Sequence, residues 1–398
     1  MNILQETNIE YKISVSDTLV LESKNLGGEL FNIDHNSVVD YFGASLEMSD
    51  SRILVGARYE DNSDNGDGRV GAVYLYGING DFILRAQASD ASEDAYFGWD
   101  VCFNDSRAYI SARKEDSIAS DSGCVYIYDF NGVELNNETK LKSSDAEAND
   151  YFGTSIDISD SKLLIGASHE DSVASDAGAV YLYDLDGTNE IKITASDGGA
   201  DEYFGSHIAI SNSNIVVGSD RWNDAAGAVY VYDLNGSEKF KITPTNPQSG
   251  SQFGYSVDIS ETKIVVGAPY LDEGSFTNLG SFYIYDLDGS NEIKINSPLL
   301  QSYSRFGEEV KILGDKIVVG SPNAQVRDTN LGVVYIYDLQ GNLLSEIQPT
   351  KPYMNYFGQK IGLSSSRILV GVMEKSIVFS FDLDSQPIMS EIIKSYKI

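Results

Sequence analysis

Histidine, tryptophan, proline and cysteine are all scarce in this 398-residue chain, and it has no long apolar run. It contains 3 histidines, 2 tryptophans, 8 prolines and 2 cysteines. No apolar stretch approaches the length of about eighteen residues that a membrane-spanning helix needs, so we expect no membrane insertion. Residues 1–25 lack a basic start followed by an apolar segment, so we expect no secretory signal.

Basic residues are also few, with 28 Lys and Arg against 60 Asp and Glu and a net charge of −32. A surface of this sign repels the phosphate backbone, which argues against a nucleic-acid partner. Catalytic patterns are missing as well. The chain has no nucleophile elbow, zinc-protease helix or phosphate loop, and His35, His169 and His207 lie far apart in the sequence.

Acidic pairs such as Glu60-Asp61, Glu115-Asp116 and Glu170-Asp171 recur at equivalent positions. A repeated pair of this kind predicts solvated loop surface rather than one tuned catalytic pair. We therefore expect a protein that is not an enzyme and holds no cofactor.

What the chain does contain is a repeated Phe-Gly dipeptide. It occurs seven times, at steps of 49 to 55 residues, with the phenylalanines at 42, 97, 152, 204, 253, 306 and 357. A period of this size, repeated this often, indicates a repeat architecture.

One unit illustrates the expected structure. The unit at 152–201 contains four short runs, at 155–159, 163–167, 178–184 and 190–194. Each run either alternates apolar and polar residues or is rich in apolar, aromatic and β-branched ones, and polar turns join the runs. We label these strands A to D. A single four-stranded sheet cannot bury both faces, whereas seven packed around an axis can. The prediction is an all-β fold, a seven-bladed β-propeller of four-stranded antiparallel blades.

Phe-Gly, then Val-Gly-Ala-Pro at 266–269 or Val-Gly-Ser-Pro at 319–322, then Gly-x-x-Tyr-x-Tyr, resembles the FG-GAP repeat. That repeat builds the seven-bladed propeller of integrin α chains and of many microbial surface proteins. The likeness covers roughly residues 29–395 and is closest to the shorter bacterial and phage variety. Integrin-type repeats often carry a calcium loop between strands A and B. Here those turns are only two to four residues long, too short for a cage of six or more oxygen ligands.

The domain prediction separates residues 1–40 from a propeller at 41–398 whose blades begin near 42, 97, 152, 204, 253, 306 and 357. The first segment is a closing strand, a hairpin or an attachment segment, and residues 12–34 could also form a degenerate eighth unit. Either this segment or a C-terminal strand at 388–392 could close the ring.

The repeat also predicts the roles of several residue types. The strand C tyrosines and the glycines after each phenylalanine are expected to serve packing and tight backbone entry. The glycines that end strand B are expected to prevent crowding at the axis or the turn. Cys102 and Cys124 are expected in strands A and C of blade two, too far apart for a disulfide, so we expect free thiols and no zinc site.

Binding is expected on the face that carries the longer D–A and B–C loops, because variable loops on a fixed scaffold usually carry it. Trp222, with Asp220 and Asp224 in the same loop, is the candidate for contact with a sugar or a protein, whereas Trp99 is expected within its blade. Asp61, Ser63, Asn65 and Asp67 resemble part of a calcium loop, and a solvated acidic loop is the competing interpretation.

The predicted function is a non-enzymatic phage virion structural protein of the tail or capsid surface, serving assembly or host attachment. Its partners would be other virion proteins or a host surface protein or glycan, and its location the virion surface. The alternative is a bacterial adhesion or carbohydrate-binding module at the cell surface or outside the cell.

Overall fold

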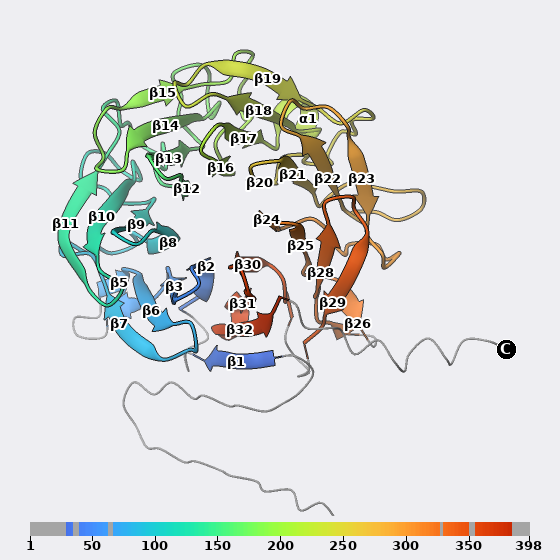
Figure 1. The fold of residues 1–398 in the computed structure, drawn as a ribbon. Helices are drawn as coiled ribbons and strands as arrows, with labels where there is room; N and C mark the ends of the chain where they lie inside the picture. The colour runs from blue at the N-terminus through green and yellow to red at the C-terminus, as the bar shows by residue number, and fades with distance from the viewer. Residues whose placement is uncertain (1–28, 35–39, 63–66, 327–328, 350–354, 384–398) are drawn as a thin grey trace, which may run out of the picture.

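Seven four-stranded antiparallel sheets stand around a central axis in the computed structural model (Figure 1). The structure describes residues 29–34, 40–62, 67–326, 329–349 and 355–383. Within the first six sheets the strands follow one another in chain order from the axis outward. The predicted all-β, seven-bladed propeller is therefore confirmed.

The inner strands (A) are β2 (Phe42–Met48), β8 (Phe97–Phe103), β12 (Ser155–Ile158), β16 (Ile208–Ile210), β20 (Ser256–Ile259), β24 (Val310–Leu313) and β30 (Lys360–Leu363). The second strands (B) are β3 (Arg52–Ala57), β9 (Arg107–Ala112), β13 (Lys162–Ala167), β17 (Ile215–Ser219), β21 (Lys263–Ala268), β25 (Lys316–Ser321) and β31 (Arg367–Val372).

The third strands (C) are β6 (Ala72–Gly77), β10 (Cys124–Phe130), β14 (Ala179–Asp184), β18 (Ala228–Tyr232), β22 (Ser281–Asp286), β28 (Val333–Asp338) and β32 (Ile377–Asp382). The outer strands (D) of the first six blades are β7 (Phe82–Ala86), β11 (Leu135–Leu141), β15 (Ile191–Ile193), β19 (Glu238–Ile242), β23 (Ile293–Asn296) and β29 (Leu343–Ile347).

The last blade takes its outer strand from the beginning of the chain. β1 (Glu29–Asp34) pairs antiparallel with β32, so the two ends of the described chain meet in one sheet (Figure 1). Residues 1–28, which include most of the possible eighth unit, and the possible closing strand at 388–392 lie outside the described residues.

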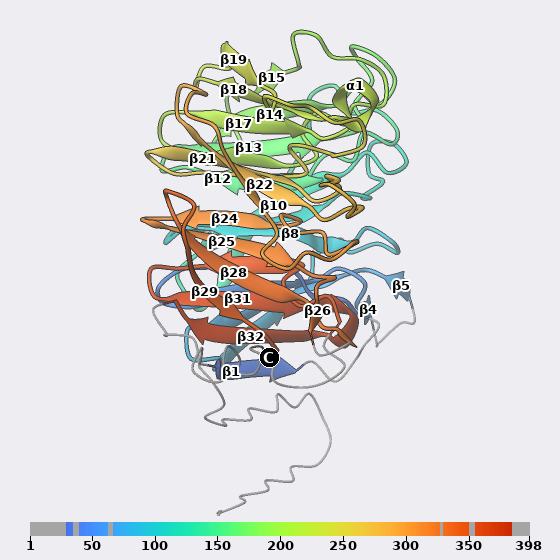
Figure 2. The same ribbon diagram turned by 90° about the vertical axis from the view of Figure 1, so that its right-hand side faces the viewer.

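The B–C connections carry small elements of their own on one face of the ring. They are the pair β4 (Asp61–Asn62) and β5 (Asp67–Arg69), the short helix α1 (Trp222–Ala225), the pair β26 (Gln325–Val326) and β27 (Thr329–Asn330), and the 3-10 turn η1 (Met373–Lys375). Figure 2 shows β4, β5, α1 and β26 along the same side of the ring. We call this side the loop face.

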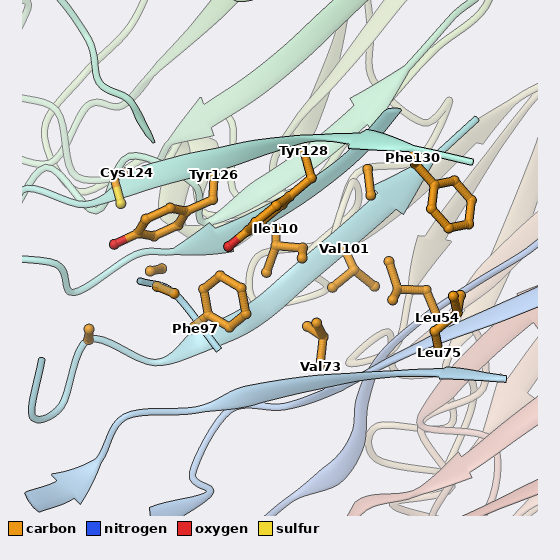
Figure 3. Close-up of a cluster of buried hydrophobic side chains, with 14 residues drawn as sticks. Leu54, Val73, Leu75, Phe97, Val101, Ile110, Cys124, Tyr126, Tyr128 and Phe130 are labelled. Carbon is orange, nitrogen blue, oxygen red and sulfur yellow. The ribbon is translucent and has the colours of Figure 1, made fainter. Parts of the chain in front are cut away.

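The core lies between neighbouring blades, where the repeat phenylalanine meets the strand C aromatic residues. Phe97 contacts Tyr126 edge-to-face at 5.3 Å between ring centroids, and both pack with Leu54, Val73 and Leu75 of the preceding blade (Figure 3). Phe152 and Tyr181 meet in the same way at 5.4 Å. Edge-to-face aromatic pairs add stability beyond the area they bury, which supports the expected packing role of these tyrosines.

The strand B glycines are needed, but for a different reason from the expected crowding at the axis or turn. A Cβ built on Gly166 would lie 2.1 Å from the carbonyl oxygen of Gly205, the Phe-Gly glycine of the next blade. Gly205 itself has a φ of +88°, a conformation that glycine adopts without strain. The two glycines together let adjacent blades approach backbone to backbone.

The two cysteines lie in β8 and β10, with β9 between them, and both are buried free thiols. The expectation from strand spacing is confirmed.

Candidate functional site

A channel runs along the propeller axis and opens on the loop face into a cavity of about 370 Å³. Residues at the start of the inner strands and just after the second strands line it. At the opposite end, the short A–B turns surround a mouth of about 790 Å³.

The residue before each Phe-Gly is held in the left-handed region of the backbone. Its φ is +54° at Tyr41, +60° at Tyr96, +54° at Tyr151 and +53° at Tyr203. This conformation is uncommon for a bulky residue, and the tight entry into each inner strand imposes it. It sets four tyrosines at equivalent positions on four successive blades.

Arginine, tryptophan and histidine side chains join these tyrosines around one side of the channel entrance. We call the group the collar. Six of its members line the cavity: Arg58, Trp99, Arg113, His169, Tyr203 and Arg221. The other four, Tyr41, Tyr59, Tyr96 and Tyr151, contact those six.

Trp99 is the centre of the collar. The Cζ of Arg113 lies 3.3 Å from the centroid of its ring, and the Cζ of Arg58 lies 4.1 Å from it. Its indole N–H donates to the carbonyl oxygen of Thr154 in the next blade at 3.0 Å. Trp99 lies within β8, as expected, but its ring takes part in the channel entrance.

Further aromatic side chains of the collar lie on both sides of the two arginines. Tyr59 contacts Tyr41 at 4.6 Å and Tyr96 at 4.9 Å between centroids. His169 lies between Tyr151 at 4.7 Å and Tyr203 at 4.6 Å. These aromatic side chains form a nearly continuous row across the first four blades.

Arg58 and Arg113 have no carboxylate partner among the described residues. The Nε of each is buried without a hydrogen-bond partner there. Burial lowers the pKa of Arg58, while burial and the charge of Arg58 lower the pKa of Arg113 to about 10. Arg85 is different, because it donates to the buried carboxylate of Glu60.

Deeper in the channel, three aspartates tie neighbouring blades together. Asp157 accepts the N–H of Ile158 in its own strand and that of Ile210 in the next blade, each at 2.8 Å. Asp100 and Asp258 bind backbone N–H groups of their own strand and of the next blade in the same way. Each of these carboxylates therefore joins two adjacent blades through hydrogen bonds to the backbone.

Glu47 faces the same part of the channel. Burial raises its pKa to about 8, and the charge of Lys311 opposes that rise. Burial likewise raises the pKa of Asp157 to about 7. Burial lowers the pKa of His207, which also lines the channel, to about 3, and its Nδ1 has no hydrogen-bond partner among the described residues.

The structure does not bring the three residues predicted for ligand contact together. Asp220 is buried at the channel, where it accepts a hydrogen bond from the Ser206 hydroxyl at 3.0 Å. The ring of Trp222 lies under Lys241 Nζ, at 3.4 Å, and packs against the core of blade four. Asp224 is exposed, with a φ of +57°.

Trp222 occupies a repeat position at which the first three blades carry glutamate. Glu60, Glu115 and Glu170 are 5–7% exposed, and the latter two bind a strand D lysine at 2.7 Å. The prediction that the repeated acidic pairs are solvated surface is therefore wrong for their glutamates. A basic side chain of strand D pairs with each one, Arg85 with Glu60 and a lysine with the other two, and in blade four Lys241 contacts the tryptophan ring instead.

The candidate calcium residues lie in the first B–C loop. Asp61 and Asp67 belong to β4 and β5, while Ser63 and Asn65 lie outside the described residues. Within the residues that the structure does describe, no cluster of three or more His, Cys, Asp or Glu could hold a metal ion. No helix there is long and apolar enough to span a membrane.

Sequence reasoning missed Arg58 and Arg113, although a signal for them was present. The Gly-Ala-Pro motif of blade five ends at Pro269, and the equivalent residues of blades one and two are Arg58 and Arg113. Substitution of a motif proline by arginine in two adjacent blades marks the position of the collar.

Comparison with known families agrees with this architecture. The model of the FG-GAP repeat matches residues 34–76, 85–128, 135–183, 188–232 and 237–285, which together are more than half of the chain. A search of curated proteins finds no significant match.

Proposed function

Because the chain belongs to the FG-GAP repeat family, we propose that it is a non-enzymatic binding module that contacts its partner through the loop face. The observation that supports this most strongly is the collar. It consists of ten aromatic and cationic side chains, six of which line the cavity at the mouth of the channel that the variable loops surround. Aromatic and arginine side chains are the residue types enriched at the energetic centres of binding surfaces.

We place this module on a virion surface, where it would serve assembly or host attachment. The likeness of its short repeats to the bacterial and phage variety supports that setting. Mass spectrometry and cryo-EM of purified particles test it. We expect the chain in stoichiometric amounts on the particle exterior, and its absence from particles would contradict the virion setting.

The alternative is an adhesion or carbohydrate-binding module of a bacterial cell surface. The aromatic side chains that line the cavity favour it. A glycan array, read with and without calcium, tests it. Binding by the purified protein together with its absence from particles would favour this alternative.

Trp222→Ala separates a ligand contact from a packing role in either setting. If Trp222 only packs under Lys241, the variant loses stability in denaturant and keeps its binding. If Trp222 touches the ligand, binding falls more than the loss of folded protein explains.

A further inference from the structure

The collar has an unusual electrostatic character for a protein with a net charge of −32. Two guanidinium groups lie against one indole ring without a carboxylate partner among the described residues, although acidic side chains outnumber basic ones by 60 to 28. Both arginines are partly buried, and a cation removed from water normally has a counter-charge, because removal from water penalises the charged form. An external anion can supply that counter-charge.

We propose that Arg58 and Arg113 form an anion-binding site that takes the carboxylate of an acidic sugar. This inference rests on the proposed binding function of the loop face and names the ligand class at that face. Guanidinium groups suit carboxylates because their N–H donors form a planar fork that matches two acceptor oxygens.

The surroundings of the two arginines favour a sugar as the carrier of the carboxylate. Tyrosine rings flank them on both sides, and the hydroxyl of Ser168 and the imidazole of His169, 2.9 Å apart, line the same cavity. Aromatic faces pack against the apolar C–H faces of a sugar ring, while hydroxyl and imidazole groups exchange hydrogen bonds with its hydroxyls. His207 adds a buried nitrogen without a partner among the described residues.

The charges of the molecule restrict the ligand further. Lys311 and Lys360 lie deeper in the cavity, but the carboxylates of Glu47, Asp157, Asp258 and Glu309 face or line that same part. The net charge of −32 repels a densely charged polyanion at long range. A ligand with one negative charge on a largely neutral body meets the two arginines without that penalty.

Isothermal titration and ligand-observed NMR on the full chain test the proposal with D-galacturonic acid and its methyl ester. The ester keeps the ring and its hydroxyls and removes only the charge. We expect the acid to bind at least about ten-fold more tightly than the ester, with an affinity that falls as salt rises. Equal binding of the two probes, or binding of neither, overturns the proposal.

Arg58→Met and Arg113→Met each retain a long apolar side chain and remove the charge, and each should weaken binding of the acid at least about ten-fold. Arg305→Met is the matched control. Arg305 also lies over a tyrosine ring, Tyr270, at 5.0 Å, but it already has a carboxylate partner in Glu308 at 3.6 Å. This variant should bind the acid as the parent does, and thermal denaturation verifies that all three variants are folded.

Two further probes separate other sources of the anion. An uncharged-side-chain dipeptide with a free carboxyl end represents a protein partner, and inorganic sulfate represents an anion without a carrier. If either binds as tightly as galacturonic acid, the sugar assignment is wrong. If the glycan array finds neutral sugars that bind independently of both arginines, the proposed binding function stands and the anion site falls.

Discussion

Replacing Gly166 by alanine tests how closely the blades approach one another. The new Cβ would lie 2.1 Å from the carbonyl oxygen of Gly205 in the next blade and 2.4 Å from the hydroxyl oxygen of Ser155. Ordinary contacts of a Cβ begin near 3.4 Å. The obstacle is mostly backbone, so the clash is relieved only if the two blades move apart by about 1 Å.

Such a movement disturbs the contacts between the two blades, including the buried hydrogen bond that the Ser155 hydroxyl donates to the Gly205 carbonyl oxygen at 2.9 Å. Overpacking of a well-packed interior costs about 1–3 kcal/mol, and we expect Gly166→Ala to reach about 3 kcal/mol because backbone yields less than side chains. With a urea m-value of about 3 kcal/mol/M for a chain of this size, the unfolding midpoint should fall by about 1 M.

Gly198→Ala provides the matched control. Gly198 lies in a loop of the same region, has no left-handed φ, and its added Cβ would make only ordinary contacts at 3.4 Å or more. Its urea unfolding midpoint should change by no more than a stability loss of about 0.5 kcal/mol would produce. Urea unfolding followed by fluorescence measures both variants. Equal midpoints for Gly166→Ala and Gly198→Ala would refute the close approach of the blades.

Three other predictions concern charges and thiols. The pKa of Glu47 is raised from 4.5 to about 8, so its contribution to stability is fully present below pH 4.5 and is lost as pH rises through about 8. Glu47→Gln should remove on the order of 5 kcal/mol of that pH dependence, as urea titrations at several pH values will reveal. Lys192→Met leaves the buried carboxylate of Glu170 without its lysine and should lower the free energy of unfolding by about 2 kcal/mol. The carboxylate partner of Lys294 is 42% exposed, so Lys294→Met should lower it by less than about 1 kcal/mol in the same assay. Burial raises the pKa of both cysteine thiols, so a thiol reagent should label them only after unfolding, and labelling of the native protein would contradict their burial.

The sequence predicts the ring well because its signals are local. Phe97-Gly98, a short apolar run and a Tyr-x-Tyr strand all fall within a few residues of one another, and each sets one strand or turn. Repetition then supplies the blade number, and strand order within a blade separates Cys102 from Cys124. No long-range contact has to be known for these predictions.

The collar could not be predicted in the same way, because its contacts join different blades. Arg58 and Trp99 are far apart in the sequence and belong to adjacent blades, and their side chains meet at one mouth only once the blades are packed side by side. The burial of Glu170 has the same origin, since its neutralising Lys192 comes from a strand that follows the whole loop. The repetition of the acidic pair in equivalent loops indicated solvated surface for this glutamate.

The arginines of the collar cannot be explained by the needs of the scaffold. At the same position in blades five and six stand Pro269 and Pro322, both buried, and those blades form the same four-stranded sheets. Arg58 and Arg113 instead place two like charges beside one indole ring, where burial lowers the pKa of each. Proline at these positions would avoid that cost and preserve the fold. Two like charges without a carboxylate partner among the described residues, in adjacent blades at the mouth of the channel, support the proposed ligand that carries the missing negative charge.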